Sequence, residues 1–404
     1  MADEEYAEKA WVKYEDITAL RTSSSSSSGG DGRSIRVLHG SVQSVDTQHR
    51  VASFVARGGG TQTAELQYDY LVAASGLRRV WPVSPRALRR KEYLSEAAGH
   101  IRSVTTGKHR VVVVGGGWHF LSLSLSLSLS LSLALSPVSG PLPPPILLYS
   151  PARQSLTAQT GAVGVEMAAE LKLVHPNLKI TLVHSRDQLL SSEPLPKELK
   201  SRTLELVHAA GVDTLLSHRL DATDEAAVDD LGNPCVRLCF TNGHTLLADH
   251  VVMAISRSIP STSFLPKTVL DDQGYVRIQA NLAFPPSEDG DDGSKDEIET
   301  AHFAVGDITR WSSIKRCGGA MHMGYLAAHN IHQCMRQRLR GTEPAFLELD
   351  EIIPPMIGLA VGKQAVAYWP EGGVTSGEDT LKTFFGDDLG FTSEFLFFFW
   401  SYVI

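Results

Sequence analysis

Two groups of small residues in this chain have the types and spacing that bind phosphate groups. The first, Gly115-Gly116-Gly117, directly follows four consecutive valines at 111–114. The second, Gly161-Ala162-Val163-Gly164, opens a stretch rich in Ala, Glu and Leu. Joined end to end, the two groups form a G-x-G-x-x-G pattern between a strand and a helix. That pattern predicts a dinucleotide site, with the pyrophosphate held at a helix N-terminus.

Each glycine of the joined pattern has its own expected task. Gly115 permits the tight turn after the strand, and either Gly117 or Gly161 lets the backbone approach the pyrophosphate. Gly164 allows the helix to pack closely against the strand. The segment that separates the two groups, residues 118–160, alternates Leu and Ser to about residue 133 and is then rich in Pro. A repeated CT dinucleotide encodes Leu-Ser, so we expect this segment to be translated intron; the alternative is a genuine surface insertion.

The nucleotide preference depends on the end of the second strand of this unit, about 20 residues after the last glycine. An acidic residue there would bind the ribose 2′-OH of NAD, but the chain has His184-Ser185-Arg186. Arg186 suits the 2′-phosphate of NADP, or it is an ordinary surface charge. Both interpretations stay open at this point.

Two further motifs place small or acidic residues after apolar strands. Residues 68–73 lead into Ala74-Ser75-Gly76, and residues 302–305 lead into Gly306-Asp307. Ligands bind at the carboxyl ends of strands in open α/β sheets, where Asp307 could accept hydrogen bonds from a polyol. Alone, the Gly-Asp pair is also a common turn. A helix is expected soon after it, from Gly318 to about residue 338.

The elements that must position these residues follow from periodicity and turn signals. Strands are expected at 35–38, 42–45, 51–55, 68–74, 111–114, 179–184, 212–216, 235–240, 250–254 and 302–305; helices are expected at 85–100, 162–171, 197–210 and 318–338. Strands that alternate with helices of this length predict an α/β fold built on a mostly parallel sheet.

The order of these motifs resembles the pyridine nucleotide-disulfide oxidoreductase superfamily, in its apoptosis-inducing-factor-like, ferroptosis-suppressor branch and especially its fungal members. The resemblance runs from about residue 9 to 392, apart from 118–160 and the acidic stretch 287–299. It implies two nested Rossmann-like domains that bind FAD and NAD(P)H. The implied boundaries are 1–105 and 255–342 for the FAD domain, 106–254 for the NAD(P)H domain and 343–404 for a small C-terminal domain.

The resemblance also implies roles for individual residues. Asp307, after Gly306, would hold the ribityl chain of FAD. Val42 matches the position whose backbone contacts adenine, and Ala74-Ser75-Gly76 matches the turn beside FAD. Glu166 would lie at the nicotinamide–flavin junction, as a tentative catalytic residue. The family begins with a glycine fingerprint that is absent here, so we expect a truncated FAD domain; the tail 393–404 also leaves the pattern, and both features suggest faults of the gene model.

Composition narrows the function further. A net charge of −8 gives no reason to expect nucleic-acid binding, and four cysteines are too few for a disulfide framework. The longest apolar run, residues 395–400, is too short to span a membrane, and no metal-ligand set is visible.

We expect a cytoplasmic enzyme that moves hydride from NAD(P)H to FAD and electrons to a quinone-like acceptor. Peripheral association with a mitochondrial or lipid-droplet surface stays open. The alternatives are an impaired nucleotide-binding protein and a redox-sensing regulator.

Overall fold

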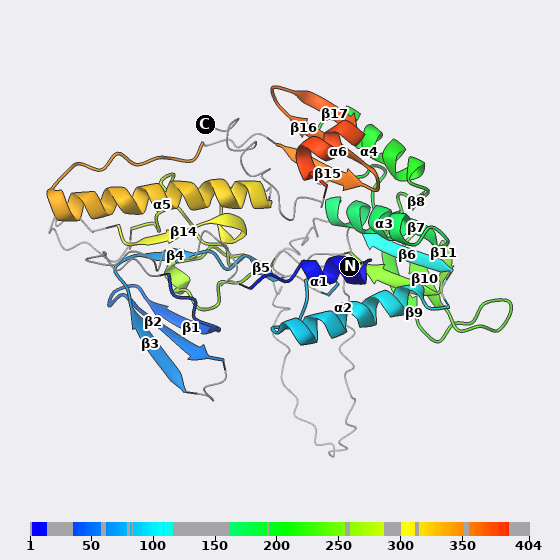
Figure 1. Ribbon diagram of the computed structural model, residues 1–404, viewed down its shortest axis with the longest axis horizontal. Coiled ribbons are helices and arrows are strands. Elements are labelled where there is room, and N and C mark those ends of the chain that lie inside the picture. The colour runs from blue at the N-terminus through cyan, green and yellow to red at the C-terminus, as the bar shows by residue number, and fades with distance from the viewer. Residues whose placement is uncertain are drawn as a thin grey trace, which may run out of the picture.

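The computed structural model describes residues 2–13, 35–57, 62–78, 81–82, 84–107, 109–115, 161–191, 194–254, 259–286, 300–311, 315–350 and 355–387. Five features named above lie outside these ranges: Gly116, Gly117, the segment 118–160, the acidic stretch 287–299 and the tail 393–404. Figure 1 shows the described elements arranged around two parallel sheets, which come from different parts of the chain.

The larger parallel sheet has four strands in the order β12-β6-β7-β8. Its strands are β6 (Arg110–Gly115), β7 (Lys179–His184), β8 (Asp213–Leu215) and β12 (His250–Met253). The valines of β6 are buried on both faces, as expected for a central parallel strand. Val111 and Val113 pack toward α3 (Ala162–Val174) and α4 (Lys197–Ala209), whereas Val112 and Val114 face β9 (Leu220–Asp224), β10 (Val236–Phe240) and β11 (Thr245–Ala248).

The smaller parallel sheet joins distant parts of the chain. Among the described residues it contains β4 (Leu71–Ala73) and β14 (His302–Ala304), with Phe303 opposite Val72. The long helix α5 (Cys317–Arg340) lies along it (Figure 1). The chain leaves this unit through β5 (Leu77–Arg78) and returns through β13 (Ile259–Pro260), which pair with each other. The four-stranded unit is therefore inserted into the two-stranded one, and the predicted nesting of two Rossmann-like units is confirmed.

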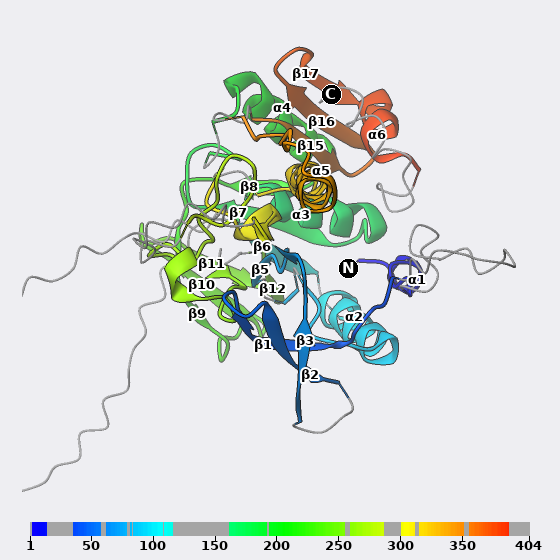
Figure 2. The same cartoon turned by 90° about the vertical axis from the view of Figure 1, so that its left-hand side faces the viewer.

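Besides the antiparallel sheet β11-β10-β9 and the β5-β13 pair, the described residues form two further antiparallel sheets. One contains β1 (Gly40–Asp46), β2 (Val51–Ala56) and β3 (Thr63–Gln67). The other contains β15 (Ile357–Val361), β16 (Gln364–Trp369) and β17 (Gly373–Gly377), followed by α6 (Glu378–Phe385). Figures 1 and 2 show the second sheet on the side of α3 and α4 and the first on the opposite side. The N-terminal α1 (Glu4–Lys9) packs on α2 (Arg90–Thr105).

Some expected elements are wrong. Residues 35–38 form no strand, and the side chains of Ile35, Val37 and Leu38 are 57%, 50% and 43% exposed. The strands β3 and β9 were not expected, because their exposed polar residues hide the period-two pattern. The strand β11 was not expected because its apolar residues are consecutive and do not alternate with polar ones. The helix expected over 85–100 begins only at Arg90 and continues to Thr105.

Candidate functional site

The glycine turn of the larger sheet, between β6 and α3, allows backbone segments to approach one another closely. Strand β6 ends at Gly115, and Gly161 is the N-cap of α3. A Cβ atom on Gly164 would lie 3.2 Å from the Cα of Gly115, and one on Gly161 would lie 2.9 Å from the Cα of Leu190. Both glycines therefore let backbone segments meet where a side chain would separate them. This geometry fits a dinucleotide at the N-terminus of α3.

A histidine joins the ends of the two central strands. The Nδ1 atom of His184, at the end of β7, lies 2.7 Å from the carbonyl oxygen of Gly115, and its Nε2 lies 3.2 Å from the hydroxyl of Ser191. Burial lowers the pKa of His184, so the neutral ring donates through Nδ1 to the Gly115 carbonyl. From the sequence, His184 was significant only because it lies where an acidic residue would bind the ribose of NAD. Its hydrogen bond to the end of β6 was not predicted.

Arg186 lies two residues beyond this histidine, in the exposed turn after β7. Its guanidinium group donates to the carbonyl oxygen of Ser191 at 3.1 Å. The side chain is thus held beside the carboxyl end of β7, where the ribose of a dinucleotide is bound in Rossmann-type sheets.

The second glycine turn lies at the carboxyl edge of the smaller sheet. The backbone N–H of Val305 donates to the carbonyl of Ala73 at 3.0 Å, so the segments Ala74-Ser75-Gly76 and Gly306-Asp307 leave the sheet side by side. Gly76 and Gly306 have φ values of +66° and +73°, which favour glycine. The Ser75 hydroxyl donates to the carbonyl oxygen of Ser261 at 2.6 Å and fixes this turn.

The start of α5 lies against the Gly306 turn. A Cβ atom on Gly306 would lie 3.1 Å from the Cβ of Ala320, and the Gly306 N–H approaches the Met323 sulfur at 3.3 Å. Gly318 and Gly319, in the first turn of α5, have nothing within 4 Å of an added Cβ. The exposed N-terminal turn of a long helix and the neighbouring Asp307 carboxylate fit the phosphate and ribityl groups of FAD.

Lys315 is a member of this site that sequence reasoning missed. Its ammonium group donates to the carbonyl oxygen of Thr309 at 2.6 Å and lies 5.1 Å from the centre of the Tyr275 ring. Burial lowers the Lys315 pKa to about 8, and the charge of Asp307 opposes that shift. No spacing in the sequence signals this residue.

Val42, which the resemblance places beside adenine, lies in β1 opposite Phe54, at an irregularity of the strand pairing. The residue is 43% exposed.

Glu166 connects the two units. It lies in the first turns of α3, and its carboxylate accepts the backbone N–H of Ala360 in β15. Burial raises the Glu166 pKa to about 7, while that hydrogen bond and the positive charge of Arg316 act in the opposite direction. Arg316 is the N-cap of α5. The glycine helix of one unit therefore approaches the N-terminus of the long helix of the other at this carboxylate.

Comparison with known proteins agrees with this arrangement. Residues 160–324 match the family model described as pyridine nucleotide-disulphide oxidoreductase. The oxidoreductase OXR1 of Ajellomyces capsulatus is 39% identical over 392 residues, which cover 96% of this chain and 70% of that protein. The chain belongs to the pyridine nucleotide-disulphide oxidoreductase family. The expected enzyme class, an oxidoreductase that uses FAD and NAD(P)H, is thereby confirmed at the level of the family.

A further relative and one solved structure are also similar to this chain. Ferroptosis suppressor protein 1 of Mus musculus is 42% identical over 190 residues, which cover 46% of this chain and 47% of that protein. The sulfide:quinone oxidoreductase of Aquifex aeolicus has a TM-score of 0.53 and 14% identity, and the match covers 90% of this chain and 74% of that one. The second likeness concerns the fold alone.

Three other features of this family member bear on the earlier expectations. Within the described ranges, no group of three or more His, Cys, Asp or Glu side chains is arranged to hold a metal ion. The helices of that part of the chain include none with the length and apolar character needed to cross a bilayer. Of the cysteines, Cys235 and Cys334 are buried, Cys239 is half-buried and Cys317 is exposed, and all four are free thiols.

Proposed function

We propose that this chain takes hydride from NAD(P)H at the glycine turn of β6 and α3 and passes electrons to a quinone-like small molecule. FAD, when bound at the Gly306 turn, supplies the hydride-accepting and electron-transferring chemistry. The acceptor part of the proposal rests on the resemblance to the ferroptosis-suppressor branch. We also propose a cytoplasmic location, which fractionation of cells that express the full chain would test.

The observation that carries this proposal is the convergence at Glu166. A hydride can move only between groups that are held in contact, so the two nucleotide sites must open toward one another. Glu166 belongs to the helix that would receive the NAD(P)H pyrophosphate, and Arg316 caps the helix beside the Gly306 turn. A carboxyl group with a pKa of about 7 at this junction can hold or release a proton near neutral pH.

The surrounding residues have simpler tasks in this proposal. Gly115 and Gly164 allow the backbone to approach the pyrophosphate, and Arg186 pairs with the 2′-phosphate of NADPH. Asp307 accepts hydrogen bonds from the ribityl hydroxyls of FAD. Lys315 places a cation close to Asp307 and Tyr275, where it offsets the charge of the carboxylate.

The test is turnover by the full chain loaded with FAD. We expect NADPH-dependent reduction of ubiquinone-1, with a pH profile that changes near pH 7. Glu166→Gln should remove that change and lower kcat by about 100-fold, the lower end of the range attributed to a positioned acid or base. Glu65→Gln, an exposed substitution on β3, is the matched control.

Other results would contradict parts of the proposal. A yellow protein that oxidises NADPH with ferricyanide but not with ubiquinone-1 would refute the quinone acceptor alone. A colourless protein that binds NADPH without turnover would instead favour the nucleotide-binding module. Nucleotide-dependent capture of a partner protein without turnover would favour the redox-sensing regulator.

A further inference from the structure

The segment that follows β7 contacts both sides of the glycine turn between β6 and α3. On the strand side, Nδ1 of His184 donates to the carbonyl oxygen of Gly115, which is 2.7 Å away. On the helix side, the backbone of Leu190 lies against Gly161, where an added Cβ would be 2.9 Å from the Cα of Leu190. The segment therefore connects the two parts of the phosphate site, which residues 116–160 separate along the chain.

Ser191 closes this segment through two different groups. Its hydroxyl lies 3.2 Å from Nε2 of His184. Because Nδ1 of the neutral ring carries the proton, Nε2 is an acceptor and the hydroxyl donates to it. The backbone carbonyl of Ser191 accepts a hydrogen bond from the guanidinium group of Arg186 at 3.1 Å. The side chain of Ser191 is thus linked to the end of β6 through His184, whereas its backbone holds Arg186.

The backbone of Leu190 is an independent sign that this arrangement serves a ligand site. The residue has a φ of +54°, and its side chain is completely buried. Leucine rarely adopts this left-handed conformation, because its Cβ crowds the following carbonyl oxygen. Residues that are held in such conformations gather at ligand sites, where the surrounding structure fixes them. At Leu190 the chain turns so that its own backbone meets Gly161 and the next hydroxyl meets His184.

We propose that Ser191 is a positioning residue of the NAD(P)H site, an inference that rests on the proposed function. Its hydroxyl holds the His184 ring, and the ring holds the carbonyl of Gly115 at the end of β6. Ser191 acts through this ring and not by contact with the nucleotide. The glycine turn receives the pyrophosphate, which NADH and NADPH share. The hydroxyl of Ser191 should therefore support the binding of both nucleotides equally.

The test is calorimetric titration of the FAD-loaded full chain with NADP⁺ and with NAD⁺, the oxidised nucleotides that cannot reduce the flavin. Ser191→Ala removes the hydroxyl and keeps the carbonyl that holds Arg186. It should weaken both nucleotides by the same factor, about fivefold, as expected for one hydrogen bond. Arg186→Ala should instead weaken NADP⁺ alone. In turnover, Ser191→Ala should raise the KM for NADPH and leave kcat unchanged, as for a loss of binding alone.

Three further variants show whether the hydroxyl of Ser191 acts through His184. Ser191→Thr keeps a hydroxyl group and should bind both nucleotides like the native chain. His184→Asn keeps an amide N–H near the position of Nδ1 but has no group in place of Nε2. In that background Ser191→Ala should cause no further loss, because the two residues belong to one network.

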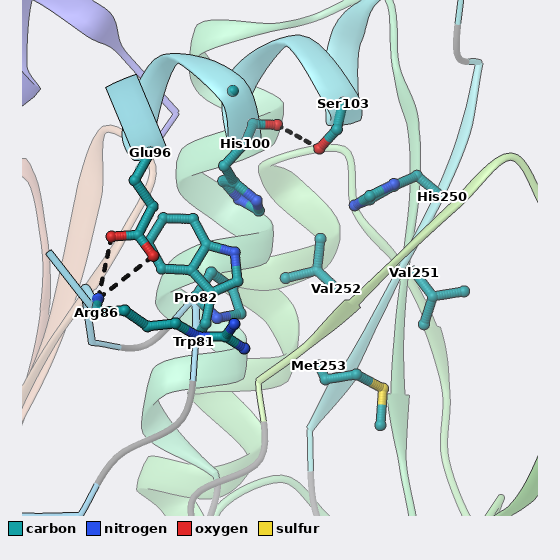
Figure 3. A pocket seen from close by; sticks show the side chains of 11 residues that line it. Trp81, Pro82, Arg86, Glu96, His100, Ser103, His250, Val251, Val252 and Met253 are labelled. Carbon is teal, nitrogen blue, oxygen red and sulfur yellow. Dashed lines mark hydrogen bonds between the residues drawn. The ribbon is translucent and has the colours of Figure 1, made fainter. Parts of the chain in front are cut away.

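Ser103→Ala is the matched control, since it also removes a hydrogen bond made by a serine hydroxyl. That bond runs to the carbonyl of His100 within α2, in the wall of a separate cavity beside β12 (Figure 3). None of the residues that line this cavity belongs to the glycine turn or to the segment after β7. Ser103→Ala should therefore leave both affinities unchanged.

Several outcomes would overturn the proposal. Native affinity for both nucleotides in Ser191→Ala would do so, and so would a loss for NADP⁺ without one for NAD⁺. A loss of the same size in the His184→Asn background would show that the hydroxyl does not act through the ring. These results would leave the proposed function in place, because the native chain still binds the nucleotides. If the native chain binds neither nucleotide, the proposed function fails and this inference fails with it.

Discussion

Replacing Glu166 by glutamine should make the protein more stable at neutral and alkaline pH, and the gain should depend on pH. The folded chain raises the Glu166 pKa from 4.5 to about 7. Between these two values the folded state holds a proton that the unfolded state has released. Raising the pH across this interval therefore favours unfolding, by about 1.4 kcal/mol per pH unit.

The whole interval corresponds to about 3 kcal/mol lost by the native protein by the time the pH exceeds 7. Glutamine does not titrate, yet its side-chain oxygen can still accept the backbone N–H of Ala360. The difference in unfolding free energy between Glu166→Gln and the native chain should therefore grow by about 2–3 kcal/mol from pH 4.5 to pH 8.

Urea denaturation at pH 5, 6, 7 and 8, followed by circular dichroism, measures this difference. Glu65→Gln, on the exposed strand β3, is the control and should differ from the native chain by the same amount at every pH. A difference for Glu166→Gln that stays constant with pH would refute the conclusion that folding raises the pKa of the Glu166 carboxyl group to about 7. The reasoning would fail in the same way if the gain decreased as the pH rose.

Three further predictions concern the larger sheet. Gly164→Val should cost roughly 1–3 kcal/mol through overpacking and should weaken NADPH binding in fluorescence titrations, whereas Gly324→Val, at an open position of α5, should leave NADPH affinity unchanged. Asp249, whose pKa is lowered to about 2 by its hydrogen bonds to Arg110 and to the backbone despite its burial, should contribute about 2 kcal/mol above pH 4. Asp249→Asn should remove that contribution, and the gap from the native chain in urea melts should close as the pH falls from 4 toward 2. Arg186→Ala should weaken NADPH about tenfold and leave NADH unchanged; equal effects on both nucleotides would mean that Arg186 is only a surface charge.

The sequence predicted the elements whose burial follows their periodicity. The strand expected at 179–184 and the helix expected from residue 197 agree with β7 and α4, because both have a continuous apolar face bounded by turn residues. Local pattern fails where burial is decided by distant partners. The apolar residues at 35–38 have no strand to join within the described structure, whereas the polar β3 is held in place by β2.

The site residues that could be predicted from the sequence are those at which the backbone requires a glycine. The residues that could not be predicted join the site through contacts between distant parts of the chain. Gly164 and Gly306 carry their own signal, because each allows a close approach that a Cβ would crowd, at 3.2 Å and 3.1 Å from the nearest atom. Lys315, in contrast, contacts the carbonyl oxygen of Thr309 and the ring of Tyr275, which come from different parts of the chain.

The pairing of β4 with β14 also determines when each part of the protein can form during synthesis. After β4 leaves the ribosome, more than 200 residues must follow before its partner is available. At 5–20 residues per second this delay is roughly 10–50 s. The inserted four-stranded unit can meanwhile form its own core, because its strands and helices are contiguous in the chain apart from residues 116–160. The half-built outer unit must therefore be protected from aggregation until α5 has been made, and FAD can be retained only after that step.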